Sequence, residues 1–227
     1  MKLARLVAGT ILIAAATSSL AVPMTFNAVD SGTYTTGGHT PNQTGYTAGY
    51  ASFFQQSFRN FFVFDFGSGI PNTVVNSATL ELAPGAGAPS GTFTLWSLEG
   101  SVSDLTAGNG QYSDLGDGTA YASVNLGNNL IAPPSISINL NNAAVSALDQ
   151  VFNFGGLWAL GGVSTASNLG FLGTNAGGVS LRLDVEDRAA VVPSPANLSL
   201  ILLGLAGLVL RHGQRVRPTK VGGTARH

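Results

Sequence analysis

Few side chains in the central part of the chain, residues 22–187, are suited to catalysis. Its single histidine is His39, in a Gly-Gly-His-Thr-Pro stretch, and the whole chain lacks cysteine. Thiolate nucleophiles, thiolate metal ligands and disulfide bonds are therefore excluded. A serine nucleophile needs a neighbouring base, and no Gly-x-Ser-x-Gly turn accompanies this histidine. We expect His39 to be a solvated loop residue, and the sequence predicts no catalytic residue.

Carboxylates are the other candidates for catalysis. All eight aspartates and three glutamates lie between residues 22 and 187. Glycoside cleavage needs two carboxyl groups roughly 5 to 9.5 Å apart. Glu81 and Glu186 fall on the polar faces of predicted strands, which indicates solvated positions, and Asp65 ends a strand. A secreted carbohydrate-active enzyme with paired carboxylates is thus the alternative to a non-enzymatic protein.

A polar, glycine-rich loop is expected at 104–118. Within it, Asp114-Leu115-Gly116-Asp117-Gly118 offers two carboxylates. Calcium binds such oxygen ligands in flexible loops, but the spacing matches no EF-hand, and Asp-Gly pairs commonly form turns. We expect no cofactor, with a structural calcium at Asp114 and Asp117 as the alternative.

Aromatic side chains in loops would suit glycan binding. The tyrosines predicted in loops are Tyr34, Tyr46, Tyr50 and Tyr112, and the last three are the candidate ligand-binding residues. Trp96 and the phenylalanines of 58–66 are expected to fill the core.

The elements that position these residues are short strands. Segment 57–66 (SFRNFFVFDF) predicts a central strand covered on both sides, because both of its faces are largely apolar. A helix is expected at 141–150, with Asn141 or Asn142 as its N-cap, and an edge strand near 33–36. The other predicted strands are 74–82, 92–98, 119–126, 135–140, 157–163, 168–172 and 179–186. The sequence therefore predicts an all-β fold, an antiparallel β-sandwich of the jelly-roll type with one short helix.

Charge is strongly segregated along the chain. Residues 22–187 contain 11 acidic and 2 basic residues, a formal charge of 2 − 11 = −9, although the whole chain carries −1. Such an acidic segment cannot neutralise phosphates, so nucleic acid is excluded as a partner. Residues 1–21 have a basic start, an apolar run and Ser19-Leu20-Ala21. They predict a signal peptide for the Sec export machinery, cleaved between Ala21 and Val22.

The C-terminal end has three consecutive parts. Residues 188–195 form a proline-containing linker that ends in Val192-Pro193-Ser194-Pro195. The apolar run 196–210 predicts a transmembrane helix of about 22 Å, short against a hydrocarbon core of about 30 Å. The basic tail 211–227 follows, and its Arg211, Arg215 and Arg217 predict a cytoplasmic end.

This order of proline motif, apolar run and basic cluster resembles a PEP-CTERM sorting signal. Ser194 stands where the family has glutamate, and residues 218–227 extend beyond its usual end. The resemblance implies a Gram-negative exported protein and processing by an exosortase-like enzyme. It also implies a precursor anchored in the inner membrane, and a mature domain at the cell surface or outside the cell. A permanently anchored domain is the alternative.

A second resemblance concerns the central part. Phe64-Asp65-Phe66, Pro71 and Ser77-Ala78-Thr79-Leu80 look like the strand–loop–strand signature of jelly-roll modules related to carbohydrate-binding domains. The resemblance implies a fold and carries over no binding residue. Together these features predict a non-enzymatic surface or extracellular-matrix protein, with exopolysaccharide as a candidate partner.

Overall fold

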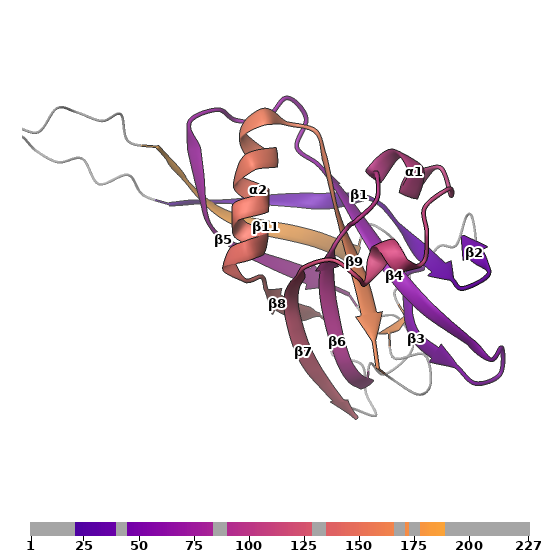
Figure 1. The fold of residues 1–227 in the computed structure, drawn as a ribbon. Coiled ribbons are helices and arrows are strands. Elements are labelled where there is room, and N and C mark those ends of the chain that lie inside the picture. Colours follow the sequence, from indigo (N-terminus) through magenta and orange to yellow (C-terminus); the bar gives the residue numbers. More distant parts are fainter. Residues whose placement is uncertain are drawn as a thin grey trace, which may run out of the picture. The chain divides into compact units, whose positions relative to one another are not determined.

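One sheet of antiparallel strands organises the part of the chain that the structure describes (Figure 1). This computed structural model describes residues 21–39, 45–83, 90–128, 135–165, 171–172 and 178–188, all within one compact unit at 19–188. The prediction of an antiparallel β domain is confirmed. The strands are β1 (Val22–Thr35), β2 (Gly38–His39), β3 (Thr47–Ala51), β4 (Gln56–Asp65), β5 (Thr73–Leu82), β6 (Ser90–Ser97), β7 (Ala120–Asn128), β8 (Ile136–Asn139), β9 (Leu157–Ser164), β10 (Phe171–Leu172) and β11 (Val179–Asp187). The helices are α1 (Val102–Thr106), the 3-10 helix η1 (Ser113–Leu115) and α2 (Asn142–Phe154).

Strand β1 corrects one prediction. We expected an edge strand near 33–36, but β1 runs for 14 residues through the middle of the sheet, between β11 and β4. Its first part pairs with β11 from Val22 to Asn27, and its second part pairs with β4 from Ala28 to Thr35. A register shift interrupts the pairing with β4 between Ala28 and Asp30. Because β1 pairs first with β11 and then with β4, this single strand links the two halves of the sheet.

The two ends of the strand order approach each other. The order is β7-β6-β9-β4-β1-β11-β5-β8. Just after β8, the Asn141 N–H donates to the carbonyl of Tyr121 in β7 at 2.8 Å. The sheet is therefore nearly closed, and its inner face surrounds the main core.

Strand β4 is covered on both sides, as predicted. Phe62 and Phe64 are fully buried in the main core, together with Leu183 of β11. Phe61 and Val63 are also buried, but they belong to a second, smaller cluster. Their alternation along β4 places the two clusters on opposite faces of the strand.

The second cluster is covered by residues 101–118, which we call the α1–η1 cap. A polar loop was predicted for most of this segment, and that prediction is wrong where α1 and η1 form. Leu105 and Leu115 are buried against the outer face of β4. Arg59 of β4 lies over the ring of Tyr112, 4.3 Å from its centre, and holds the cap from the sheet side. The cap is thus a packed layer with few apolar residues.

Helix α2 begins as predicted and is longer than predicted. The side chain of Asn141 accepts from the amides of Ala143 and Ala144, at 3.1 and 3.2 Å, and caps the helix. Leu148 and Phe152, four residues apart, are buried on one face in the main core. The helix ends at Gly155, whose φ of 81° lies in the left-handed region.

Several predicted segments lie outside the described residues. They are the signal peptide up to residue 20, the linker from 189 to 195, the apolar run 196–210 and the tail 211–227. Within the described part of the chain, no helix is long and apolar enough to span a bilayer. Ala21 directly precedes β1, which begins at Val22.

Candidate functional site

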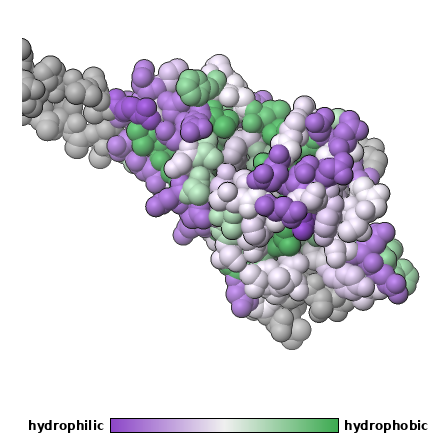
Figure 2. Space-filling view, viewed as in Figure 1, coloured by the Kyte–Doolittle hydropathy of each residue, from purple (hydrophilic) through white to green (hydrophobic). Residues whose placement is uncertain are grey.

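A cleft of about 410 Å³ lies beside the C-terminal end of α2. Its walls come from the loop between β4 and β5, from the last turns of α2 and from the residue after β11. Figure 2 shows hydrophilic and hydrophobic side chains mixed over this end of the molecule. The lining residues are Pro71, Asn72, Asp149, Gln150, Asn153, Phe154 and Arg188. The cleft combines an aromatic ring, amides and one ion pair.

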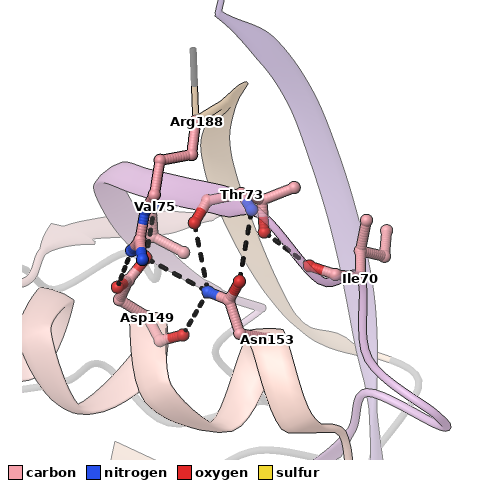
Figure 3. A network of polar contacts seen from close by, with 6 residues as sticks. All are labelled: Ile70, Thr73, Val75, Asp149, Asn153 and Arg188. Carbon is pink, nitrogen blue, oxygen red and sulfur yellow. Dashed lines mark hydrogen bonds and ion pairs between the residues drawn. The ribbon is translucent and has the colours of Figure 1, made fainter. Parts of the chain in front are cut away.

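Two side chains of α2 hold the start of β5 (Figure 3). Strand β8 pairs with β5 only over Thr79–Leu82, so another group must satisfy this edge near the start of the strand. Asn153 accepts from the Thr73 N–H at 3.2 Å and donates to the Thr73 carbonyl at 3.1 Å. Asp149, one turn earlier, accepts from the Val75 N–H at 3.0 Å. The helix side chains thus take the place of a neighbouring strand.

Arg188 closes this network where the described chain ends. Its Nη2 lies 3.1 Å from Oδ2 of Asp149, and its backbone N–H donates to the Asn72 carbonyl at 2.6 Å. The arginine side chain is 57% exposed, so solvent screens the ion pair, and its contribution to stability is at most about 1 kcal/mol. The ion pair mainly sets the positions of the Asp149 carboxylate and the Arg188 guanidinium in the cleft.

Two of the segments that line the cleft, the β4–β5 loop and the end of α2, approach each other closely through their backbones next to it. The Ile70 N–H donates to the Phe152 carbonyl at 2.9 Å, and the Gly156 N–H donates to the Gly67 carbonyl at 2.9 Å. Gly69 and Gly155 face each other there, and a Cβ on either would overlap backbone of the other segment. Both have positive φ, 76° and 81°. Glycine is therefore required at both positions for the loop to dock.

An exposed aromatic residue lies among the lining residues of the cleft. The Phe154 side chain is 85% exposed although it ends a helix that is otherwise anchored in the core. The exposed residues Asn72 and Gln150 carry amides that can donate and accept. Asn153, by contrast, is engaged with β5 and positions the cleft.

The sequence did not single out these residues. Asp149 and Asn153 stand four apart beside the buried Leu148 and Phe152, a spacing that marks a second inward-facing stripe on α2. Their partners on β5 are more than seventy residues away in the chain, which no local pattern reveals.

The calcium candidates are engaged with protein groups. Asp117 forms an ion pair with Arg59 at 3.1 Å, and Asp114 accepts from the Gln111 N–H at 3.0 Å. Among the described residues, no three acidic, histidine or cysteine side chains gather as a metal site would require. Both aspartates stabilise the α1–η1 cap.

The three candidate tyrosines have different surroundings. Tyr46 was predicted in a loop as a candidate ligand-binding residue. It directly precedes β3, but its side chain is fully buried and its hydroxyl donates to the Ala83 carbonyl at 2.7 Å. Burial raises the pKa of Tyr46 to about 12. Tyr112 is half-buried under Arg59, and Tyr50, which is 40% exposed, is the most exposed of the three.

Tyr34 and His39 also differ from expectation. Tyr34 was placed in a loop, but it is fully buried in β1 and its hydroxyl donates to the Leu105 carbonyl at 2.7 Å. Burial raises its pKa above the ordinary value. His39 lies in β2 with its ring centre 4.7 Å from that of Tyr34, and it is half-buried rather than solvated in a loop.

The cleft contains one carboxylate, Asp149, which is paired with Arg188. Asp65 accepts from the Gly67 N–H, and Glu81 accepts from the hydroxyl of Ser137 on the neighbouring strand. The lining of the cleft thus holds no second carboxyl group beside Asp149.

The sorting and topology residues cannot be placed. Val192, Pro193, Ser194 and Pro195 lie outside the described residues, as do Arg211, Arg215 and Arg217.

Comparisons with known proteins do not assign the chain to a family. No family model matches the chain, and no curated protein matches it.

Proposed function

We propose that this chain is an exported, non-enzymatic surface or matrix protein whose β domain binds exopolysaccharide in the cleft beside α2. The observation that carries the proposal is the exposed Phe154 ring at the edge of a cleft lined by amides and a fixed ion pair. A sugar ring has an apolar face of C–H groups and a rim of hydroxyls. An aromatic ring flanked by polar side chains matches both parts.

Five of the seven lining residues have a role in this proposal. The Phe154 ring stacks against the apolar face of one sugar, while Asn72 and Gln150 exchange hydrogen bonds with its hydroxyls. Asp149 and Arg188 neutralise each other, so the cleft suits an uncharged saccharide. With a single carboxylate in the lining, the cleft favours binding over hydrolysis by a carboxylate pair.

Export is the second part of the proposal. A signal peptide cleaved after Ala21 would direct the chain to the Sec machinery, and the PEP-CTERM-like tail would hold the precursor in the inner membrane for an exosortase-like enzyme. The acidic charge of 22–187 between basic ends supports this topology. A jelly-roll sandwich is the finer fold that we propose, supported by β1, which links the two halves of the sheet.

Titration calorimetry of the domain 22–188 with oligosaccharides released from the exopolysaccharide of the producing cells tests the proposal. We expect Phe154→Ser to weaken binding about tenfold, equal to about 1.4 kcal/mol, because the stacking ring is lost. Phe154→Tyr keeps the ring and is the matched control, with binding within about twofold of wild type. Absence of heat with wild-type domain, or equal affinities for the two variants, would reject the cleft as a saccharide site.

A further inference from the structure

The turn between β3 and β4 carries a second group of exposed aromatic rings. We call it the hairpin tip, defined by Tyr50, Phe53 and Phe54. Phe53 is 90% exposed and Phe54 is 61% exposed, and their rings meet edge to face with centres 5.2 Å apart. Tyr50, just before the turn, is 40% exposed. In Figure 2, hydrophobic side chains lie beside hydrophilic ones at the lower right, where Figure 1 shows the turn between β3 and β4.

The size of the hairpin tip limits what it can bind. At about 150 to 250 Å² for each ring, the exposed fractions amount to about 290 to 480 Å² of aromatic surface. A stable protein interface needs about 800 Å² from each partner, so the tip is too small to hold a second copy of the chain. One or two sugar rings would cover it.

The charges of the chain also limit which ligand the hairpin tip can bind. No charged residue occurs from 45 to 58, so the tip offers nothing to an ionic group. The segment 22–187 carries −9, which repels an anionic lipid surface. An uncharged saccharide chain fits both facts.

The hairpin tip and the cleft lie at opposite ends of β4. The tip immediately precedes Gln56, where β4 begins, and the loop that follows Asp65 forms a wall of the cleft. Ten residues of extended strand span about 33 Å. This distance equals the length of several sugar units, so two polysaccharide chains can bind the two surfaces without touching each other.

We infer that the domain bridges two exopolysaccharide chains, one stacked on Phe154 in the cleft and one on the hairpin tip. The inference rests on the proposed function, because it assigns a second saccharide surface to the same domain. A monomer with two separate saccharide surfaces joins chains into a network, whereas a single site only decorates them.

A capture assay tests the bridging. Biotinylated exopolysaccharide from the producing cells is fixed on streptavidin beads, domain 22–188 is added, and fluorescein-labelled exopolysaccharide is added last. Wild-type domain is expected to retain the labelled chain. The double variant Phe53→Ser, Phe54→Ser should remain on the beads through the cleft but lose at least tenfold of the labelled chain. Phe154→Ser should remain through the tip and also fail to bridge.

The outcomes separate the two claims. If wild-type domain does not bind the beads, the proposed function fails and the inference fails with it. If Phe154→Ser weakens binding but the tip variant bridges like wild type, only the inference is overturned. Light scattering of the free domain checks for dimers, since bridging by a dimer would also overturn it. So would binding of the tip to phosphatidylcholine vesicles in place of the labelled chain.

Discussion

Asn153 shows how one side chain can replace a length of strand. Its amide pairs with both backbone groups of Thr73 and joins the last turn of α2 to β5. In Asn153→Ala the partly buried Thr73 N–H and C=O lose their partner, which costs about 1 to 3 kcal/mol. Alanine is the better helix former, so the measured loss is a lower bound.

The stability of Asn153→Ala is measured by urea unfolding, as the shift of the transition midpoint at an unchanged m-value. Gln150→Ala, an exposed position of the same helix, is the control and should change stability by no more than about 0.5 kcal/mol. Equal losses for the two variants would show that the amide pairing to β5 contributes nothing of its own.

Tyr46 makes the stability of the folded domain fall at alkaline pH. Burial raises its pKa from 10.0 to about 12, so between these values the unfolded chain releases the phenolic proton and the folded domain keeps it. The contribution of Tyr46 is complete below pH 10 and is lost as the pH rises through about 12. At about 1.36 kcal/mol for each pKa unit, the loss is roughly 2 to 3 kcal/mol.

Urea unfolding at pH 8 and pH 11.5 checks this dependence. Tyr46→Phe loses the hydrogen bond to Ala83, so it is less stable at pH 8, but its stability should fall less steeply between the two pH values. Tyr50→Phe changes an exposed tyrosine and should keep the wild-type slope. A wild-type slope in Tyr46→Phe as well would contradict the assignment.

Among the elements, the β4–β5 loop and α2 depend on each other through two glycines. Gly69→Ala places a Cβ against the backbone of 152–155, whereas Gly67→Ala places one in open space. Both positions have positive φ, so both variants share a backbone cost of about 1 to 2 kcal/mol. We expect Gly69→Ala to lose at least 1 kcal/mol more than Gly67→Ala, and to weaken saccharide binding because the loop that carries the lining residues Pro71 and Asn72 shifts.

Urea unfolding compares the free energies of unfolding of the two alanine variants. They are matched because both substitutions lie in the same loop at a positive φ. Similar stabilities would mean that the loop moves away from α2 without cost, and that the glycine contact does not shape the cleft.

Sequence patterns predicted the elements whose signals are local. Alternation in β5 and β11, the two apolar faces of β4 and the Asn141 cap of α2 all reflect neighbours in the chain. The extent of β1 was missed because glycine, threonine and asparagine dominate 26–50 locally, while its pairing partners lie far along the chain. The α1–η1 cap was missed because only a few buried residues, Leu105 and Leu115 among them, hold it in place.

The candidate site was less predictable than the fold. The Phe61 and Val63 face of β4 indicated that something covers it, but not that residues 101–118 do so. Likewise, Phe154 looks in sequence like the core residue Phe152. Because α2 continues through both residues instead of ending near 150 as predicted, Phe154 points about 200° away from the buried Phe152, into solvent. Exposure of an aromatic ring depends on where the elements end, which is the least certain part of any sequence-based prediction.

At the scale of the whole molecule, the two proposed cleavage sites lie on either side of the β domain. Val22 already pairs with Val185, so cleavage after Ala21 leaves β1 whole, whereas cleavage even three residues later would remove its first pairs with β11. At the other end, β11 stops at Asp187 and Arg188 is held by Asn72 and Asp149.

Intact-mass spectrometry of protein recovered from the producing cells tests both cuts. We expect a mature chain that begins at Val22 and lacks Arg217, because the proposed sorting enzyme removes the apolar run and the basic tail. Introducing the glutamate of the PEP-CTERM pattern with Ser194→Glu should increase the processed fraction, and Ser180→Glu, on β11, is a control with the same added charge. A mature chain that still contains Arg217 would make this domain a permanently anchored one, with its saccharide surfaces fixed at the membrane instead of released into the matrix.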